Sequence, residues 1–383
     1  MSAPQHCTRG PVCNCVPHVM RISFATSGET AAVLSPHDFA GKSGKDVKRV
    51  LVHFLGATRY SQRLLTGGQQ IPDDQIFTED LREVQVLLLP FKRDRPRDYK
   101  LLLLATERND AGKVEMFLDT PLDPGDFGGD PLYAAARQGN LQCVKLLLEA
   151  NAFNFFNSDG HSTLWIACNR GHAEVVGLLL AASAGADIVD MDAHVTPLMT
   201  AASAGNAQIT SLLLAGRAEV DGKADLGVTA LNLAARFDHC HVVELLLQAR
   251  ASQDLCDDYG ETPLTAAAWN GNNDVVKLLL TTGAQKDLAD LDGDTPLIAA
   301  AKQARVQTVS LLLAARASVN RASVENYSPL WFAALNDDFI IAASLLDAKA
   351  DLGAVKQHAL DVGSNGVSKF CTHIAAMRLF FAV

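Results

Sequence analysis

The sequence predicts a solenoid of stacked α-helix pairs, preceded by a small α+β domain. Two observations carry this prediction. One leucine recurs at a nearly constant step through most of the chain, whereas the residues before position 92 lack this period and alternate apolar with polar residues in places. A fixed step of about 33 residues is typical of repeat proteins, whose units bury their apolar faces against each other. The recurring leucines are Leu132, Leu164, Leu198, Leu231, Leu264, Leu297 and Leu330.

The composition favours small helices and a protein partner. Hydrophobic residues make up 48% of the chain, charged residues 20% and aromatic residues 6%, which indicates a globular protein without a large aromatic core. Residues 1–98 hold 13 Lys and Arg against 10 Asp and Glu, a net charge of +3, and the remainder holds 20 against 33, a net charge of −13. Phosphate repels such an acidic segment, so we expect no nucleic-acid partner and favour a basic protein.

No apolar run approaches the ~18 residues that a membrane-spanning helix needs, so no membrane span is expected. Residues 1–18 contain no apolar stretch of the kind found in secretory signals, and we expect a disordered segment there and a protein of the cytoplasm or the nucleus. The segment also contains His6, Cys13, Cys15 and His18. A metal site is the less favoured interpretation of these four residues, because their spacing lacks a paired CxxC.

Residues 19–91 predict a small mixed domain. Residues 20–24 alternate apolar with polar side chains, a turn is expected at Ser27 and Gly28, and a second strand is expected over residues 30–34. An amphipathic helix is predicted over residues 45–54, because Val47, Val50, Leu51 and Phe54 follow helical spacing. Further strands are predicted over residues 62–65 and 84–89. This order of elements suggests a β-grasp fold.

The domain resembles the ubiquitin-like family. The resemblance rests on residues 61–68 (SQRLLTGG), on residues 71–74 (IPDD) and on the last strand, residues 84–89. It implies a β-grasp fold and a module that docks on ubiquitin or proteasome machinery. Leu65 and Leu87 fall where ubiquitin has its exposed apolar patch, and the equal alternative is that both are buried or that their positions are incidental. No Gly-Gly pair follows Phe91, and a basic linker over residues 92–98 stands there instead, so we expect a fixed docking module that is not conjugated.

The repeats span residues 126–351. In four of them Thr or Ser precedes a proline, a pattern that predicts a helix N-cap followed by proline at the first helical position. A small pair such as Ala267-Ala268 follows each recurring leucine, and a second aliphatic helix follows a turn. Glycine marks that turn where a positive φ is needed. These turn glycines are Gly139, Gly171, Gly205 and Gly271.

This pattern closely resembles the ankyrin repeat, a β-turn followed by two antiparallel helices. The resemblance implies a seven-repeat stack that binds proteins and has no enzymatic activity of its own. A degenerate capping helix pair is expected over residues 99–125. Residues 352–383 break the pattern and are expected to form either a cap, with a helix from Phe370, or a disordered tail. Where a glycine is usual after the second helix, we interpret four cations as ion-pair partners of nearby aspartates: Arg217, Arg250, Arg316 and Lys349.

No set of residues predicts catalysis, a metal site or a cofactor. Residues 290–294 (DLDGD) hint at a calcium loop, but Thr295 and Ala301 stand where an EF-hand needs glycine and glutamate. His239 and His241 suggest a metal pair, yet residues two apart on a helix point in different directions. His239 also occupies a position where ankyrin repeats often have histidine.

By resemblance, an ankyrin stack binds its partner on the concave side, formed by the turn tips and the exposed face of the first helices. Phe237 and Trp269 are the most suggestive residues there, because exposed aromatics beside arginine are typical of interface hot spots. A structural ladder in which the two rings pack on each other is the alternative. The candidate binding residues are Leu226, Arg236, Phe237, Tyr259, Glu261, Trp269, Leu291, Asp292, Asp294, Lys302, Tyr327 and Leu335.

Two functions are compatible with this organisation. The first is a monomeric adaptor whose repeats hold a client protein, basic in character, while the ubiquitin-like domain docks on ubiquitin or proteasome components. The second is a structural scaffold in which the ubiquitin-like domain caps or orients the stack and has no role in the ubiquitin pathway. An enzyme regulated by ankyrin repeats is disfavoured, because no segment is left for a catalytic domain.

Overall fold

The computed structural model describes residues 20–24, 30–34, 40, 42–55, 62–66, 69–77, 83–88, 96–120, 129–153, 155–189 and 194–381. The chain divides into two compact units. The first unit comprises Met1–Leu132 and Gln142–Asn154, and the second comprises Tyr133–Leu141 and Phe155–Val383. The candidate metal ligands of residues 1–18, the turn at Ser27 and Gly28 and most of the predicted basic linker lie outside the described residues.

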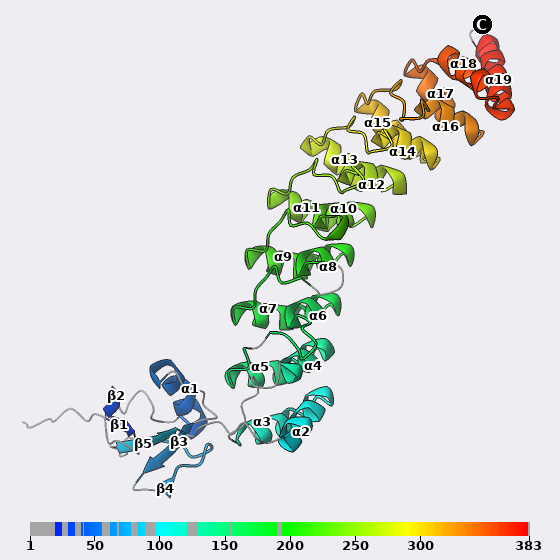
Figure 1. Ribbon diagram of the computed structural model, residues 1–383. Coiled ribbons are helices and arrows are strands. Elements are labelled where there is room, and N and C mark those ends of the chain that lie inside the picture. Colours follow the sequence, from blue (N-terminus) through cyan, green and yellow to red (C-terminus); the bar gives the residue numbers. More distant parts are fainter. Residues whose placement is uncertain are drawn as a thin grey trace, which may run out of the picture. The chain divides into compact units, whose positions relative to one another are not determined.

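The first unit contains a mixed five-stranded sheet and one helix beside it (Figure 1). The strand order is β2-β1-β5-β3-β4; β1 and β5 run parallel, and the other neighbouring pairs run antiparallel. Strands β1, β2, β3 and β5 and helix α1 overlap the segments predicted from the sequence, and the short strand β4 was not predicted. Their bounds are β1 Met20–Phe24, β2 Thr30–Leu34, α1 Gly44–Leu55, β3 Gln62–Thr66, β4 Gln69–Gln70 and β5 Glu83–Leu88.

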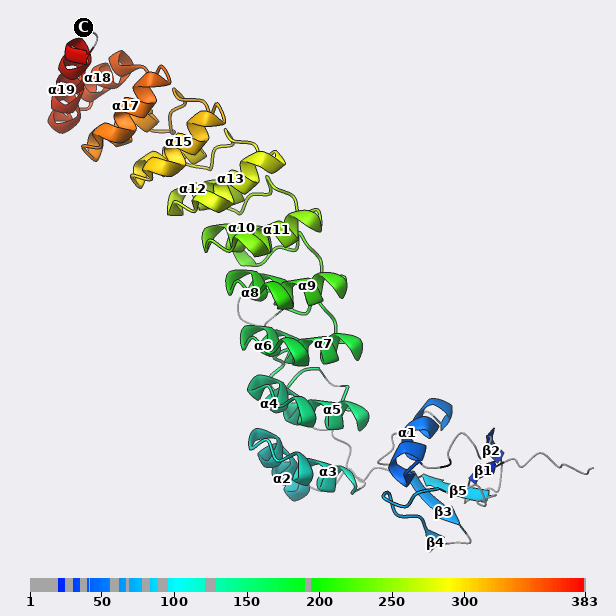
Figure 2. The ribbon, with the colours of Figure 1, turned by 180° about the vertical axis from the view of Figure 1, so that it is seen from behind.

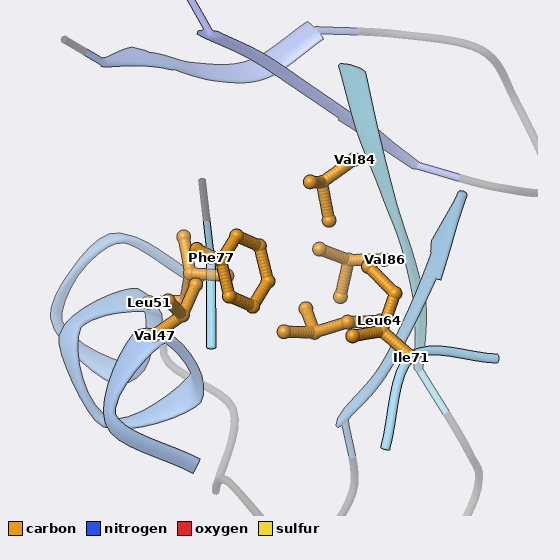
Figure 3. Close-up of a cluster of buried hydrophobic side chains, with 7 residues drawn as sticks. All are labelled: Val47, Leu51, Leu64, Ile71, Phe77, Val84 and Val86. Atoms are coloured by element: carbon orange, nitrogen blue, oxygen red, sulfur yellow. The ribbon is translucent and has the colours of Figure 1, made fainter. Parts of the chain in front are cut away.

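A small hydrophobic core joins α1 to the sheet. Val47 and Leu51 lie one turn apart on α1, and both are fully buried. They face the side chains that alternate along β3 and β5, as Figure 3 shows. The alternation follows from the two-residue period of a strand, which sends successive side chains to opposite faces. The core consists of Val47, Leu51, Leu64, Ile71, Phe77, Val84 and Val86.

A helix pair follows the sheet in the chain, α2 (Pro96–Glu107) and α3 (Ala111–Leu118). Leu102, Val114 and Leu118 are completely buried, so the pair has an apolar interior of its own. Asp110 caps α3 by accepting a hydrogen bond from the Lys113 backbone N–H. Helix α2 begins at Pro96, so the last residues of the predicted linker are helical. Proline suits the first turn of a helix, where its missing N–H has no partner to lose.

Fourteen further described helices fall within residues 126–351, where the sequence predicts seven repeats of two helices each. From α6 onward the first helices lie in one row and the second helices in another (Figures 1 and 2). The first helices are α4 Asp130–Gln138, α6 Thr163–Asn169, α8 Pro197–Ser203, α10 Ala230–Arg236, α12 Pro263–Asn270, α14 Pro296–Lys302 and α16 Pro329–Leu335. The second helices are α5 Leu141–Glu149, α7 Ala173–Ala181, α9 Ala207–Ala215, α11 Cys240–Gln248, α13 Asn273–Thr282, α15 Val306–Ala314 and α17 Phe339–Asp347.

The predicted caps and small residues have their expected roles. Thr262 and Thr295 each accept a hydrogen bond from the backbone N–H three residues on, and Pro263 and Pro296 open their helices. The alanines of the small pairs are buried, which lets neighbouring first helices pack closely. Each of the four predicted turn glycines has a positive φ, between 69° and 81°.

Hydrogen bonds between repeats replace the predicted ion pairs. Asp221, Asp254 and Asp287 each accept a bond from a backbone N–H of the next repeat, at 2.7–2.9 Å. Among the described residues, the four cations after the second helices form no ion pair with any aspartate, so that interpretation is wrong. Their positive φ values, 62–70°, are as expected for positions that usually hold glycine. The aspartates instead stabilise the joints between repeats.

The chain continues after the seventh pair with two more helices, α18 (Leu352–Asp361) and α19 (Asn365–Phe381). Helix α19 packs against α16 and α18. Val367, Phe370, Cys371 and Ile374 are buried at helical spacing, and the rings of Phe370 and Phe339 lie 4.6 Å apart. The helix therefore begins before Phe370, and its buried face covers the last repeat.

Candidate protein-binding surface

The candidate concave residues occupy two lines along the second unit. Leu226, Tyr259, Leu291 and Asp292 sit at the tips of successive β-turns. Arg236, Phe237, Trp269, Lys302 and Leu335 sit at or just after the C-terminal ends of first helices. The apolar members of these two lines are exposed, by 37% for Trp269 and by 52–72% for the others, whereas the candidate residues Tyr327 and Asp294 are partly and almost fully buried. Large apolar side chains left in water along one side of a repeat stack favour a protein-binding surface.

Backbone hydrogen bonds join each tip to the next. The Asp258 N–H donates to the Leu226 carbonyl, the Leu291 N–H donates to the Tyr259 carbonyl, and the Val324 N–H donates to the Asp292 carbonyl, at 2.8–2.9 Å. Gly260 and Gly293 have φ values of 80° and 79°, and a Cβ added to either would come within 3 Å of the next tip's backbone. The tips are therefore held as one continuous edge.

Two cationic side chains of the first helices form ion pairs with carboxylates of the turns. Arg236 bonds Glu261 and lies 4.0 Å from Asp257. The Lys302 Nζ lies 3.0 Å from an oxygen of Asp294, whose side chain is almost fully buried. Arg236 therefore pairs with Glu261, and Lys302 pairs with Asp294. These pairs leave less unpaired charge on this surface than the sequence suggests.

Lys302 also lies over two aromatic rings. Its Nζ is 5.6 Å from the centre of the Trp269 ring and 5.4 Å from that of Phe332, distances at which an ammonium group is attracted to a ring face. The ladder alternative is not observed, because no ring contact joins Phe237 to Trp269 in the described part of the chain. Trp269 is held by its contact with Lys302, and Phe237 lies 6.4 Å from the His239 ring.

A pocket of about 360 Å³ opens between the last two tips. Tyr327, predicted from the sequence, lines it and is stacked on Trp331, 4.9 Å between ring centres. Phe332, Val324 and Glu325 also line it, and sequence reasoning missed all three. Val324 and Glu325 stand one repeat after Leu291 and Asp292, so their signal was present, whereas no repeat position pointed to Phe332. The pocket is lined by Leu291, Asp292, Asp294, Lys302, Ser323, Val324, Glu325, Tyr327 and Phe332.

The acidic residues of the turns serve the fold as well as the surface. Asp257 accepts hydrogen bonds from the N–H groups of Tyr259 and Glu261, and Asp290 does the same for Asp292 and Asp294. Burial raises the pKa of Glu261, repulsion from Asp257 and Asp290 adds to this, and Arg236 opposes it. Burial likewise raises the pKa of Asp290. The surface therefore concentrates carboxylates that a cation would stabilise.

The metal-like motifs have structural roles. The Asp290 carboxylate receives two backbone N–H groups, and Asp294 is paired with Lys302. The His239 Nε2 lies 3.0 Å from the Ser203 carbonyl of the preceding repeat, and His241 lies 3.4 Å from Glu244. No cluster of three potential metal ligands occurs within the described ranges. Within the same ranges, no helix is long and apolar enough to cross a membrane.

In the first unit, Leu65 and Leu87 lie on the face of the sheet opposite its core. Their neighbours Leu64 and Val86 are fully buried, whereas both leucines are partly exposed. In the register of β3 and β5, Leu65 pairs with Gln85 and Arg63 pairs with Leu87. The two leucines are therefore diagonal neighbours, a relation that places them about 7–8 Å apart. The alternative of full burial is not observed.

Three cationic side chains of the sheet domain contact helix pairs within the first unit. Lys45 pairs with Glu115, the Arg49 guanidinium lies 3.0 Å from Glu149, and Arg63 donates to the Asp119 carbonyl. Each of these contacts is at least partly exposed to solvent. Exposed ion pairs of this kind contribute about 0–1 kcal/mol each, so they orient the domain only weakly.

Comparison with known proteins identifies the repeats. Residues 102–192, 198–290 and 267–356 match the family model described as ankyrin repeats, in 3 copies. These ranges cover more than half of the chain. The chain belongs to the ankyrin-repeat family. Ankyrin repeats are protein-interaction scaffolds, and the described helix pairs have the organisation that the family implies.

Curated relatives share only a segment with this chain. It is 38% identical over 119 residues to the E3 ubiquitin-protein ligase KEG of Arabidopsis thaliana, a match covering 29% of this chain and 7% of that protein. It is 38% identical over 122 residues to the probable E3 ubiquitin-protein ligase XBOS33 of Oryza sativa subsp. japonica, covering 30% and 23%. These matches span less than a quarter of either relative, so their activities do not transfer with the repeats.

Among solved structures, the human ASB11 ankyrin repeat domain is similar to this chain. The TM-score is 0.52 at 30% sequence identity, and the match covers 58% of this chain and 98% of that one. This similarity agrees with the helix pairs of the second unit.

Proposed function

We propose that this protein is a non-enzymatic adaptor. Its ankyrin stack binds a client protein on the concave side, and its N-terminal sheet domain is a ubiquitin-like module that docks on ubiquitin or proteasome machinery. The observation that carries the client-binding half is the line of exposed apolar side chains along joined turn tips. Its candidate contact residues combine exposed aromatics with paired charges, a mixture typical of protein interfaces.

Support for the ubiquitin-like half comes from the sheet. The first and last strands pair in parallel in the middle of a mixed sheet, and one helix packs on that sheet, which supports the proposed β-grasp fold. Leu65 and Leu87 supply a small apolar patch on its outer face. Buried free thiols at Cys143, Cys168 and Cys371 suit a reducing compartment, so we place the adaptor in the cytoplasm or the nucleus.

One observation favours the scaffold alternative. The contacts of Lys45, Arg49 and Arg63 with helices or turns of the first unit would orient the sheet domain without any partner. Under that alternative, Leu65 and Leu87 have no binding role.

Affinity purification with the full chain separates the two functions. We expect the wild type to recover ubiquitin-pathway or proteasome proteins together with a client, and the Leu65→Ala/Leu87→Ala variant to lose the former and keep the latter. The matched control is Gln69→Ala/Gln70→Ala on the exposed strand β4, which should recover both sets. Recovery of a client without any ubiquitin-pathway protein, by wild type and variants alike, would establish the scaffold alternative.

A further inference from the structure

Four consecutive turn tips carry the same pair of side chains. Each tip offers one carboxylate and one apolar residue next to each other, and all eight residues are exposed. The apolar members are exposed by 55–77%. We call these residues the tip row: Asp225-Leu226, Asp258-Tyr259, Leu291-Asp292 and Val324-Glu325.

The order of the pair reverses along the row. The carboxylate comes first in the two earlier tips and second in the two later ones, so both residue types are kept although their positions exchange. The hydrogen bonds that form the turns require neither the carboxylate nor the apolar side chain of a tip. In the second and third tips, the turn N–H groups donate hydrogen bonds to the adjacent Asp257 and Asp290. A backbone carbonyl in each of the first three tips accepts a hydrogen bond from an N–H of the next tip.

Three of the four carboxylates have no partner within the described ranges. Asp225 lies 3.1 Å from the His194 Nδ1, but the side chains of Asp258, Asp292 and Glu325 form no hydrogen bond or ion pair there. The tip backbones, in contrast, are already hydrogen-bonded to each other or to turn aspartates. A partner would therefore be recognised by side chains, through charge and apolar contact, and not by adding a strand.

The spacing of the row limits the conformation of a partner. Consecutive first helices pack directly on each other, so one repeat advances about 8–10 Å along the stack. A polyproline II helix advances about 9.3 Å in one turn of three residues and shows every third side chain on one face. A strand shows every second side chain, about 6.6 Å apart, and so falls out of step with the row.

We propose that the tip row binds an extended cationic segment of the client in polyproline II conformation, with lysine or arginine at every third position. This inference rests on the proposed function of the repeats as a client-binding surface. The cations face Asp258, Asp292 and Glu325, and apolar residues of the segment contact Leu226, Tyr259, Leu291 and Val324.

A synthetic probe tests the proposal without knowledge of the client. The probe is a fluorescein-labelled peptide of four Arg-Leu-Pro triplets, and its control contains the same twelve residues with the four arginines adjacent. We expect the full-length protein to bind the triplet peptide at least about fivefold more tightly than the control, in fluorescence anisotropy at low salt. Equal affinity for the two peptides would contradict the spacing argument.

Charge variants locate the binding site. Asp258→Asn/Asp292→Asn/Glu325→Gln should weaken binding of the triplet peptide about tenfold, because several exposed ion pairs of modest strength are lost together. The matched control removes the same charge from second helices: Glu174→Gln/Glu244→Gln/Asp274→Asn. It should change affinity less than twofold. An equal loss of affinity in both triple variants would show that the peptide responds only to the net charge of the protein, and would overturn the proposal.

The purified client separates this inference from the function on which it rests. If a client recovered with the full chain binds the tip variant and the wild type equally well, the tip row is not its site. The adaptor function would survive that result, whereas the polyproline II segment would not.

Discussion

Replacing Phe237 and Trp269 together with alanine is expected to weaken client binding at least about 30-fold, the equivalent of one hot spot worth about 2 kcal/mol. Both side chains are large, aromatic and exposed, and in the described part of the chain their two rings do not contact each other. Trp269 is also preorganised, since Lys302 lies over its ring and Asp294 fixes Lys302. The measurement is the dissociation constant of the purified client by isothermal titration calorimetry.

A control variant removes apolar area elsewhere. Leu360 on α18 is 58% exposed and is not among the candidate contact residues. Leu360→Ala should leave the dissociation constant unchanged, and circular dichroism at the temperature of the binding assay should show that both variants are folded. Wild-type affinity in the Phe237→Ala/Trp269→Ala protein would show that the client binds another surface.

The second large effect is expected from Gly293→Ala, which should destabilise the stack by about 2–3 kcal/mol. A positive φ costs a residue with a Cβ about 1–2 kcal/mol. The new Cβ would also lie 2.7 Å from the Val324 nitrogen, so the hydrogen bond between Val324 and Asp292 must stretch or break, at about 1 kcal/mol. The midpoint of urea unfolding, followed by circular dichroism, measures the effect.

A second glycine separates strain from contact. Gly171 has a φ of 78°, yet the nearest atom to an added Cβ is the Asn206 Nδ2 at 3.8 Å. Gly171→Ala therefore carries the conformational cost alone. The difference between the two variants reports what the close approach of the tips contributes. Equal destabilisation by both substitutions would mean that the tips are not held against each other.

Much of the fold was predictable because the recurring leucine reveals the length of the repeat directly in the sequence. The leucine step places each helix pair, and Thr262-Pro263 and Thr295-Pro296 mark helix starts by a local mechanism that the structure repeats. The C-terminal pair was missed in part, because Gly363 stands where the next leucine should be. Its signal was nevertheless present, since Val367, Phe370, Cys371 and Ile374 follow helical spacing.

Long-range contacts account for what the sequence could not predict. The strand order of the sheet depends on pairing between segments far apart in the chain, as between β1 and β5. The site residues divide in the same way. Leu226, Tyr259 and Leu291 were found from the turn pattern, and Val324 stands one repeat after Leu291. Phe332 could not be found in this way, because its place in the pocket depends on how its helix packs. The Lys302 contact with two rings depends on packing between three repeats.

The most direct test of the central claim is hydrogen exchange of the full chain with and without its client. We expect slower exchange on binding at the tips from Asp225 to Glu325 and at the C-terminal ends of the first helices α10–α16. Exchange in the second helices α11, α13, α15 and α17 should be unaffected. Protection confined to the second helices would place the client on the opposite side of the stack and contradict the concave surface assigned to it.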